Sequence, residues 1–198
     1  KDVEDLKGVG SQKNQEITQL REDVEDLRGV ESQKNQEITQ LTKDVEDLRG
    51  VESQKNQEIA QVAANLKMYE TTWDEVINKG KIDLINETNF DKNITAVTSP
   101  ENIVGIEGFK DYYNNYLVGF SNITFTIVDL FGQGDKIVKH WNFKGTHSGE
   151  FFGISATGNE VNIDGVTLVK MKDGKIAQEQ DFLDNLEFYQ QLGLMPRE

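Results

Sequence analysis

Two acidic residues lie two positions apart in a segment whose residue types are typical of a strand. They are Glu179 and Asp181, in residues 175–183. Because successive strand side chains point to opposite faces, both carboxylates are expected on the same face. Next to an apolar cavity, loss of water would raise the pKa of such a carboxyl group, and a neighbouring carboxylate would raise it further. The pair is therefore a candidate acid–base centre, able to carry a proton near neutral pH.

Few other residues offer chemistry. The chain has two histidines and no cysteine, which excludes disulfides, thiolate catalysis and zinc–thiolate sites. His147 shares one face of its segment with Trp141 and Phe143, and it is a candidate both for catalysis and for a structural role at the strand end. His140 is expected to point the other way, into solvent. Since the acidic pair and one histidine match no recognised ligand spacing, we expect no metal and no cofactor.

The segments that must position these residues follow two periods. Apolar residues recur at helical spacing in the first part of the chain and alternate from about residue 123 onward. Helices are expected over residues 60–78, 81–87 and 107–118, the first ending at Gly80, with a closing helical turn at 185–192. Strands are expected over residues 123–131, 136–146, 159–170 and 175–183, while 89–104 reads as irregular. Turns are expected at Gly132–Asp135, Thr157–Asn159 and Lys172–Lys175, the last two of the hairpin type.

Helices followed by long antiparallel strands predict an α+β fold. We expect a cone-shaped, curved antiparallel sheet with three helices on one face. The inside of such a cone can hold a small apolar molecule. Trp73, Tyr113, Trp141 and Phe143 are candidates for lining it, the alternative being ordinary core packing.

The first third of the chain contains a repeat of 21 residues, which is three heptads. DVEDL recurs at 2–6, 23–27 and 44–48, and SQKNQEI at 11–17, 32–38 and 53–59. With Val3 at heptad position a, two apolar heptads alternate with one polar heptad, a spacing that favours a left-handed coiled coil. Residues 1–64 are thus expected to form a long coiled-coil helix, and 65–198 the α+β domain. A single solvated helix is the alternative.

The repeat also bears on assembly. β-branched residues at a and Leu at d favour two parallel strands, whereas Val30 and Val51 at g favour three, so dimer and trimer both stay open. We expect the chain to associate with itself through the coiled coil and through its sheet.

The charge balance excludes some partners. The formal net charge is −14 with no basic stripe, so nucleic acid is not an expected partner. No run of about 18 apolar residues is present, so no membrane span is expected. A soluble, cytoplasmic protein is the default expectation, and an exported form stays open because the chain starts at Lys1 rather than Met.

Three segments together resemble one protein family. The stretch 141–158 reads WNFKGTHSGEFFGISATG, residues 173–184 read DGKIAQEQDFLD, and residues 190–193 read QQLG. This combination resembles the SnoaL-like polyketide cyclases over about residues 65–193. The resemblance implies the cone fold of the nuclear-transport-factor-2-like superfamily, a pocket between sheet and helices, and frequent dimerisation.

The resemblance also implies residue roles. In the characterised cyclases an Asp at the position of Asp181 acts as acid and base in an intramolecular aldol closure. A His of those cyclases is replaced here by Thr167, which cannot titrate but can donate a hydrogen bond to a ligand. Two functions remain: an acid–base enzyme in which Asp181 is assisted by Glu179, Thr167 or His147, and a non-catalytic module that binds a small apolar molecule or mediates oligomerisation.

Overall fold

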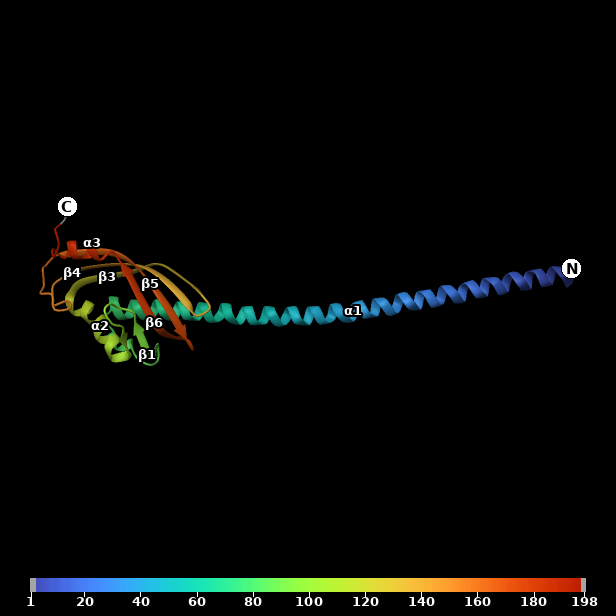
Figure 1. Cartoon of the computed structure of the whole chain (residues 1–198), viewed down its shortest axis with the longest axis horizontal. Coiled ribbons are helices and arrows are strands. Elements are labelled where there is room, and N and C mark those ends of the chain that lie inside the picture. The colour runs from blue at the N-terminus through green and yellow to red at the C-terminus, as the bar shows by residue number, and fades with distance from the viewer. Residues whose placement is uncertain (1–2, 197–198) are drawn as a thin grey trace. The chain divides into compact units, whose positions relative to one another are not determined.

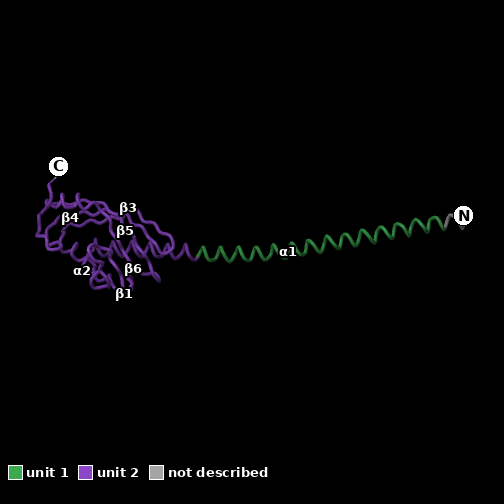
Figure 2. Tube along the Cα trace, in the orientation of Figure 1, with its two compact units in different colours: residues 1–56 green, residues 57–198 purple. Residues whose placement is uncertain are grey.

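A computed structural model describes residues 3–196, and the chain divides into two compact units, residues 1–56 and 57–198 (Figure 2). Helix α1 (Val3–Trp73) contributes to both units, which are described separately below. Because this helix is continuous through residue 64, no break in the backbone marks the expected boundary there. The division at residue 64 stays a prediction.

In the first unit, α1 repeats its side-chain contacts every 21 residues. Gln19 donates to Asp23 (3.0 Å) and Gln40 donates to Asp44 (2.7 Å). The apolar side chains of the heptads are exposed in the single chain, with fractions between 46% and 68% for Ile17, Leu20, Val24, Leu27, Val30, Ile38, Leu41, Val45, Leu48 and Val51. The side chains of Val3 and Leu6, the first a and d residues, lie outside the described part. The first unit therefore offers an apolar row that nothing within its own described residues covers.

The second unit is built on one curved sheet of six strands (Figure 1). The strand order is β2-β1-β6-β5-β4-β3. The strands are β1 (Phe90–Ala96), β2 (Ile103–Val104), β3 (Phe120–Gln133), β4 (Lys136–His147), β5 (Glu160–Lys172) and β6 (Lys175–Leu183). In β4 and β5 the odd-numbered residues face inward and are mostly buried, as the period of two predicts.

The expected α+β class and curved sheet are confirmed, with two corrections. Residues 89–104, expected to be irregular, contain β1 and β2. Moreover, β1 pairs in parallel with β6, so the sheet is mixed rather than purely antiparallel. The parallel partner of β1 lies about eighty residues later in the chain, and such a non-local pairing leaves no signal in the local pattern.

The turns also differ from expectation in one place. Asp173 and Gly174 both have positive φ (51° and 75°) between the paired residues Lys172 and Lys175, which is the expected hairpin with a type I′ turn. The turn at 132–135 is a hairpin as well, because Gln133 pairs with Lys136. Thr157–Asn159 is not a hairpin turn: it ends a longer connection between β4 and β5 that contains a bridge between Phe151 and Ile154.

The end of α1 and helix α2 lie on the inner side of the curved sheet (Figure 1). Buried side chains from the helical segments and from the strands form one core. The last turns of α1 continue into a short π-helical segment, Asp74–Asn78, followed by a 3₁₀ turn, Ile82–Leu84. Helix α2 (Ile106–Gly119) and helix α3 (Asn185–Gln191) complete the set. The core between these elements and the sheet is rich in aromatic rings, including Tyr69, Trp73, Phe90, Phe109, Phe120 and Phe151.

Candidate functional site

A cavity of about 50 Å³ lies between the inner face of the sheet and the helices. Every layer of the unit contributes to its wall. The lining residues are Trp73, Ile77, Tyr113, Tyr116, Phe125, Lys139, Trp141, Phe143, Ile163, Asp181, Leu183 and Phe188. Four of the residues predicted to line a cavity are among them, together with the predicted proton carrier, Asp181. The wall is mainly aromatic, and its charged groups are Lys139 and Asp181.

The two predicted carboxylates are joined by one phenol. The Tyr113 hydroxyl lies 2.9 Å from Glu179 Oε2 and 3.0 Å from Asp181 Oδ2. On the other side of Glu179, the indole Nε1 of Trp73 donates to Oε1 at 2.9 Å. Glu179 is buried behind the cavity wall, whereas Asp181 is part of the wall and half-buried. Glu179 and Asp181 therefore lie close together on one face of the strand, but only Asp181 lines the cavity.

The Tyr113 hydroxyl is the donor shared by the two carboxyl groups. A phenol carries one proton, so Tyr113 divides that proton between the two contacts. Burial raises the pKa of Glu179, nearby Lys139 lowers it, and nearby Asp181 raises it. Burial therefore makes Glu179 easier to protonate than an ordinary glutamate.

Two neighbouring phenols also act on these carboxyl groups. Burial and the two carboxyl groups raise the pKa of Tyr113 well above its usual value, so it stays a neutral donor. The Tyr69 hydroxyl points toward Glu179 and lowers the pKa of that carboxyl, but it makes no hydrogen bond of ordinary geometry with any described residue.

A second chain of hydrogen bonds reaches Asp181 from the sheet. Trp141 Nε1 donates to Thr167 Oγ1 at 2.9 Å, and the Thr167 hydroxyl donates to Asp181 Oδ1 at 2.5 Å. Asp181 therefore accepts from two hydroxyl groups, one at each carboxyl oxygen. Gly165 makes room for the indole, since a Cβ at that position would lie 2.2 Å from Trp141 Cζ2. Thr167 is fully buried and reaches the cavity only through Asp181.

Lys139 is the cavity residue that the sequence analysis missed. It is 3% exposed, and its ammonium lies over three ring faces, 5.2 Å from the centroid of Tyr69, 4.8 Å from Trp73 and 5.3 Å from Phe125. We call these three rings the ring cage. A usable signal was present in the sequence, because Lys139 occupies an inward position of the period-two pattern between Ile137 and Trp141.

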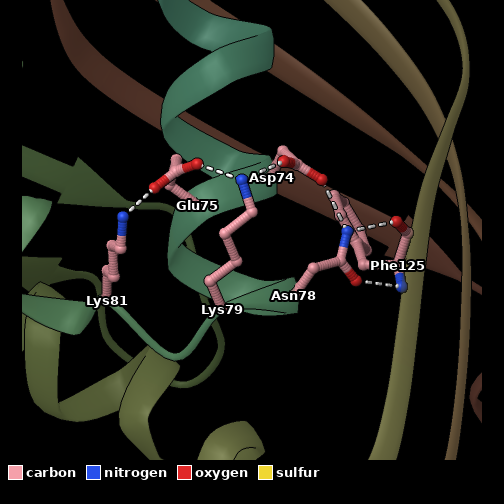
Figure 3. Close-up of polar contacts among 6 residues, drawn as sticks. All are labelled: Asp74, Glu75, Asn78, Lys79, Lys81 and Phe125. Carbon is pink, nitrogen blue, oxygen red and sulfur yellow. Dashed lines mark hydrogen bonds and ion pairs between the residues drawn. The ribbon is translucent and has the colours of Figure 1, made fainter.

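The end of the first long helix holds one wall of the cavity in place. Asn78 pairs with the backbone of Phe125 in edge strand β3, donating to its carbonyl (2.8 Å) and accepting from its N–H (2.7 Å; Figure 3). On the same short segment, Glu75 forms ion pairs with Lys79 and Lys81. Because Asn78 satisfies both backbone groups of Phe125, it fixes a ring that borders the cavity and belongs to the ring cage.

The two histidines lie away from this site. His147 is fully buried among Phe120 and Phe151 and is not part of the cavity wall. Its Nδ1 accepts from the backbone N–H of Thr157 at 3.3 Å and lies 3.1 Å from the Thr157 hydroxyl. This arrangement favours the structural role that the sequence analysis left open. His140 is partly exposed, and its Nε2 lies 3.9 Å from Asp164 Oδ1.

The residues present do not form a metal centre in the described part of the chain, where no group of three or more His, Asp and Glu side chains is suitably placed. Among the described helices, none combines the length and apolar character needed to cross a membrane. The site is an aromatic cavity with one carboxylate and one ammonium in its wall.

A curved sheet folded over helices around such a cavity defines the nuclear-transport-factor-2-like class of α+β domains. The family model for SnoaL-like polyketide cyclases matches residues 66–192, and the chain belongs to that family. None of the curated proteins compared with the chain matches it.

Several solved structures share the fold. TsrD from Streptomyces laurentii is 25% identical, with 67% of this chain and 97% of that chain covered and a TM-score of 0.60. A putative SnoaL-like polyketide cyclase from Jannaschia sp. CCS1 is 20% identical, with 66% of this chain and 94% of that chain covered and a TM-score of 0.57. AclR from Streptomyces galilaeus, described as a putative hydroxylase, is 18% identical, with 68% of this chain and 99% of that chain covered and a TM-score of 0.59. The matches under 25% identity speak for the fold alone.

Proposed function

We propose that the cone binds a small, largely apolar carbonyl compound and that Asp181 moves a proton at the carbon next to the carbonyl group. The observation that carries this proposal is the position of Asp181, which meets an aromatic cavity while Tyr113 and Thr167 hold its two oxygens. A carboxylate held in a fixed position beside an aromatic cavity is an effective general base.

The reaction can be written with the residues present. Asp181 removes the proton, and the electron pair of the broken C–H bond moves to the carbonyl oxygen to form an enolate. If a carbon–carbon double bond is conjugated with the enolate, return of the proton to the far end of that system gives an isomerisation. Attack of the enolate carbon on a second carbonyl carbon of the same molecule instead closes a ring in an aldol step, and the alkoxide that forms takes the proton back from Asp181. Glu179 lies behind the wall and accepts from Tyr113, which keeps Asp181 oriented.

Proton removal can be tested without knowing the natural substrate. The protein is incubated in D₂O with cyclopentanone, and replacement of the hydrogens next to the carbonyl is followed by NMR. We expect Asp181→Asn to lower the protein-dependent exchange rate by about 100-fold or more, the usual contribution of a positioned acid–base group. Asp184→Asn is the matched control, because Asp184 is an exposed helix cap that Asn can replace. Equal exchange by Asp181→Asn and the unchanged protein would contradict the proposal.

A second candidate is a non-catalytic binding module. The observation that favours it is Thr167, which stands where the cyclases that the chain resembles have a titratable His. In that case cyclopentanone binds, detected by line broadening in NMR, but the unchanged protein accelerates no exchange. Binding without exchange, unaffected by Asp181→Asn, would select this function.

We also propose that the chain associates with itself through the heptads of residues 1–64. The exposed apolar row on α1 supports this, because an isolated helix with such a row is marginally stable without a partner. Leu20→Asp with Leu41→Asp should lower the mass measured by sedimentation velocity. Gln15→Asp with Gln36→Asp adds the same charge at the outward f position and should leave the mass unchanged. An identical mass for both pairs would disprove the coiled coil.

The outer face of the sheet is a second proposed contact between copies. Leu168 (44% exposed) and Phe182 (48% exposed) face outward from β5 and β6, next to Val166, which pairs with Phe182. Leu168→Ser with Phe182→Ser should reduce the mass further in a protein that already carries the Leu20→Asp and Leu41→Asp changes. An unchanged mass would remove the sheet as a contact.

A further inference from the structure

Three inward-facing residues form a row across the centre of the sheet. Lys139 on β4 pairs with Thr167 on β5, which pairs with Asp181 on β6. Because neighbouring strands lie about 4.8 Å apart, the Cα atoms of Lys139 and Asp181 are separated by roughly 10 Å. Both residues border the same cavity. A molecule in the cavity is therefore placed between a carboxylate and an ammonium.

The surroundings of Lys139 leave its donors without an acceptor. The ring cage attracts the positive charge electrostatically, but ring faces do not replace the oxygen acceptors that three N–H groups require. In the described part of the chain, no hydrogen bond or ion pair joins the ammonium to another residue. Because Lys139 lines the cavity, its ammonium is placed to donate to an oxygen of a molecule bound there.

A purely internal role for Lys139, as the counter-ion of Glu179, fits less well. Both oxygens of Glu179 are already engaged, one by the Trp73 indole and one by the Tyr113 hydroxyl. The negative group that faces the cavity with Lys139 is Asp181, at the other end of the row.

We propose that Lys139 is the anion-binding group of the cavity, which holds the ligand oxygen that becomes negative when Asp181 removes the neighbouring proton. The substrate class is then a compact ketone or ester that forms an enolate. For the proton step this inference rests on the proposed function, whereas the binding of an anionic oxygen by Lys139 does not depend on it.

The charges balance through the step. Before it, the Lys139 ammonium faces the Asp181 carboxylate across the cavity. During it, the proton passes to Asp181 and the electron pair of the C–H bond passes to the ligand oxygen. Afterwards the ammonium faces an enolate, and Asp181 is neutral. The net charge of the cavity does not change, and a fixed donor at the developing negative oxygen lowers the barrier.

A phenolate tests the anion site directly, because it presents a negative oxygen on an apolar ring. The probe is 4-nitrophenolate, whose ionised form is seen by its absorbance, and nitrobenzene is its neutral counterpart. The protein used is the full chain with Asp181→Asn, which mimics the protonated carboxyl. Adding Lys139→Met should weaken binding of 4-nitrophenolate by about tenfold or more, as expected for a hydrogen bond to a charged group, and should leave nitrobenzene nearly unaffected.

Two controls keep the result interpretable. Lys144→Met removes an exposed lysine from the same strand and should change neither affinity. Lys139→Arg keeps the charge and should preserve the preference for the phenolate, which separates loss of charge from loss of packing if Lys139→Met is poorly folded. Equal binding of 4-nitrophenolate with and without Lys139, or no binding to the Asp181→Asn protein, would overturn the inference.

The two proposals can fail separately. If the unchanged protein shows no exchange on cyclopentanone while phenolate binding depends on Lys139, the acid–base function is wrong and the anion site stands. If exchange depends on Asp181 but phenolate binding is independent of Lys139, the anion site is wrong and the acid–base function stands.

Discussion

One continuous helix behaves in two different ways along its length. In the first unit of the chain, Leu27 and Leu48 of α1 are 68% and 67% exposed, whereas Tyr69 and Trp73 of the same helix are 0% and 1% exposed. The early turns repeat one set of residues every 21 positions, and the last turns use aromatic residues that occur once. One helix thus contains two segments that differ in residue pattern and in burial.

The difference shows where each part of the helix obtains its stability. The last turns are stabilised within the chain, because their rings pack against the sheet and against α2. The early turns have no such packing in the single chain, and a long amphipathic helix without a packed face is marginal in water. Their apolar row is the surface that the proposed self-association would cover, while the α+β unit has a core of its own.

The largest expected effect tests this contrast within α1. Trp73→Ala removes a buried indole and leaves a cavity, so it should lower the free energy of unfolding of the α+β unit by about 3–5 kcal/mol. Leu27→Ala removes an exposed side chain and should leave that free energy nearly unchanged. Urea unfolding monitored by circular dichroism checks both.

A control separates packing from hydrogen bonding at Trp73. Trp73→Phe keeps a ring but loses the donor to Glu179. Its free energy of unfolding should therefore lie between that of Trp73→Ala and that of the unchanged protein. Similar losses for Leu27→Ala and Trp73→Ala would show that the two parts of the helix do not differ as argued.

Glycine provides the second test, because the same substitution should act in opposite directions in the two regions. At Gly165 an added methyl group would overlap the Trp141 ring. Gly165→Ala should therefore destabilise the unit by about 1–3 kcal/mol, the usual range for overpacking. The shifted indole should also lose its bond to Thr167. Thermal unfolding measures the first effect, and the indole N–H resonance of Trp141 in NMR reports the second.

A smaller ring should restore part of the loss. Trp141→Phe in the Gly165→Ala protein relieves the overlap, so the double change should cost less than the sum of the two single changes. Strict additivity would mean that the ring and the new methyl group do not interact.

The sequence is informative about the regular elements and less so about how they meet. The expected strand at 175–183 matches β6, and the helix expected at 107–118 lies within α2, because each has a clear period of apolar residues. Strand β1 is not predicted, since its residues do not alternate cleanly and its main partner is distant in the chain. Local pattern therefore predicts elements better than it predicts their neighbours.

At the candidate site, too, the local pattern predicts where a residue faces better than it predicts which residues it contacts. The period of two is enough to predict that Glu179 and Asp181 share one face of their strand. That Tyr113 bridges them depends on how α2 packs over the sheet, which the sequence does not indicate. Lys139 escapes this reasoning because lysine is usually a surface residue, and its ring cage is assembled from α1 and β3.

The third prediction concerns pH, where a carboxyl group buried in the α+β unit should differ from the solvated ones of the first unit. Burial raises the pKa of Glu179 above its usual 4.5. Between pH 4.5 and the pKa of Glu179 in the folded protein, the folded protein holds a proton that the unfolded chain has released. The stabilisation that this proton provides is therefore complete below pH 4.5. The free energy of unfolding then falls as the pH rises toward the pKa of the folded protein, by at most about 1.4 kcal/mol per pH unit.

A neutral isostere checks the assignment to Glu179. Glu179→Gln cannot titrate, so urea unfolding across this pH range should give a flatter dependence than for the unchanged protein. Glu46→Gln, an exposed change on α1 in the first unit, should leave the dependence as it was. Parallel curves for Glu179→Gln and the unchanged protein would place the linked proton elsewhere.

The smallest effect returns to the repeat and completes the glycine comparison. Gly50 lies at the outward f position of α1, and a methyl group added there would meet no atom within 4 Å. Gly50→Ala should therefore stabilise the helix by about 1 kcal/mol, because alanine loses less backbone freedom than glycine on forming a helix. The helical signal in circular dichroism should melt at a higher temperature, while the oligomeric mass stays the same since the a and d positions are unchanged. A lower melting temperature would mean that Gly50 faces a partner chain too closely for a methyl group, and the heptad positions assigned to this helix would have to be shifted.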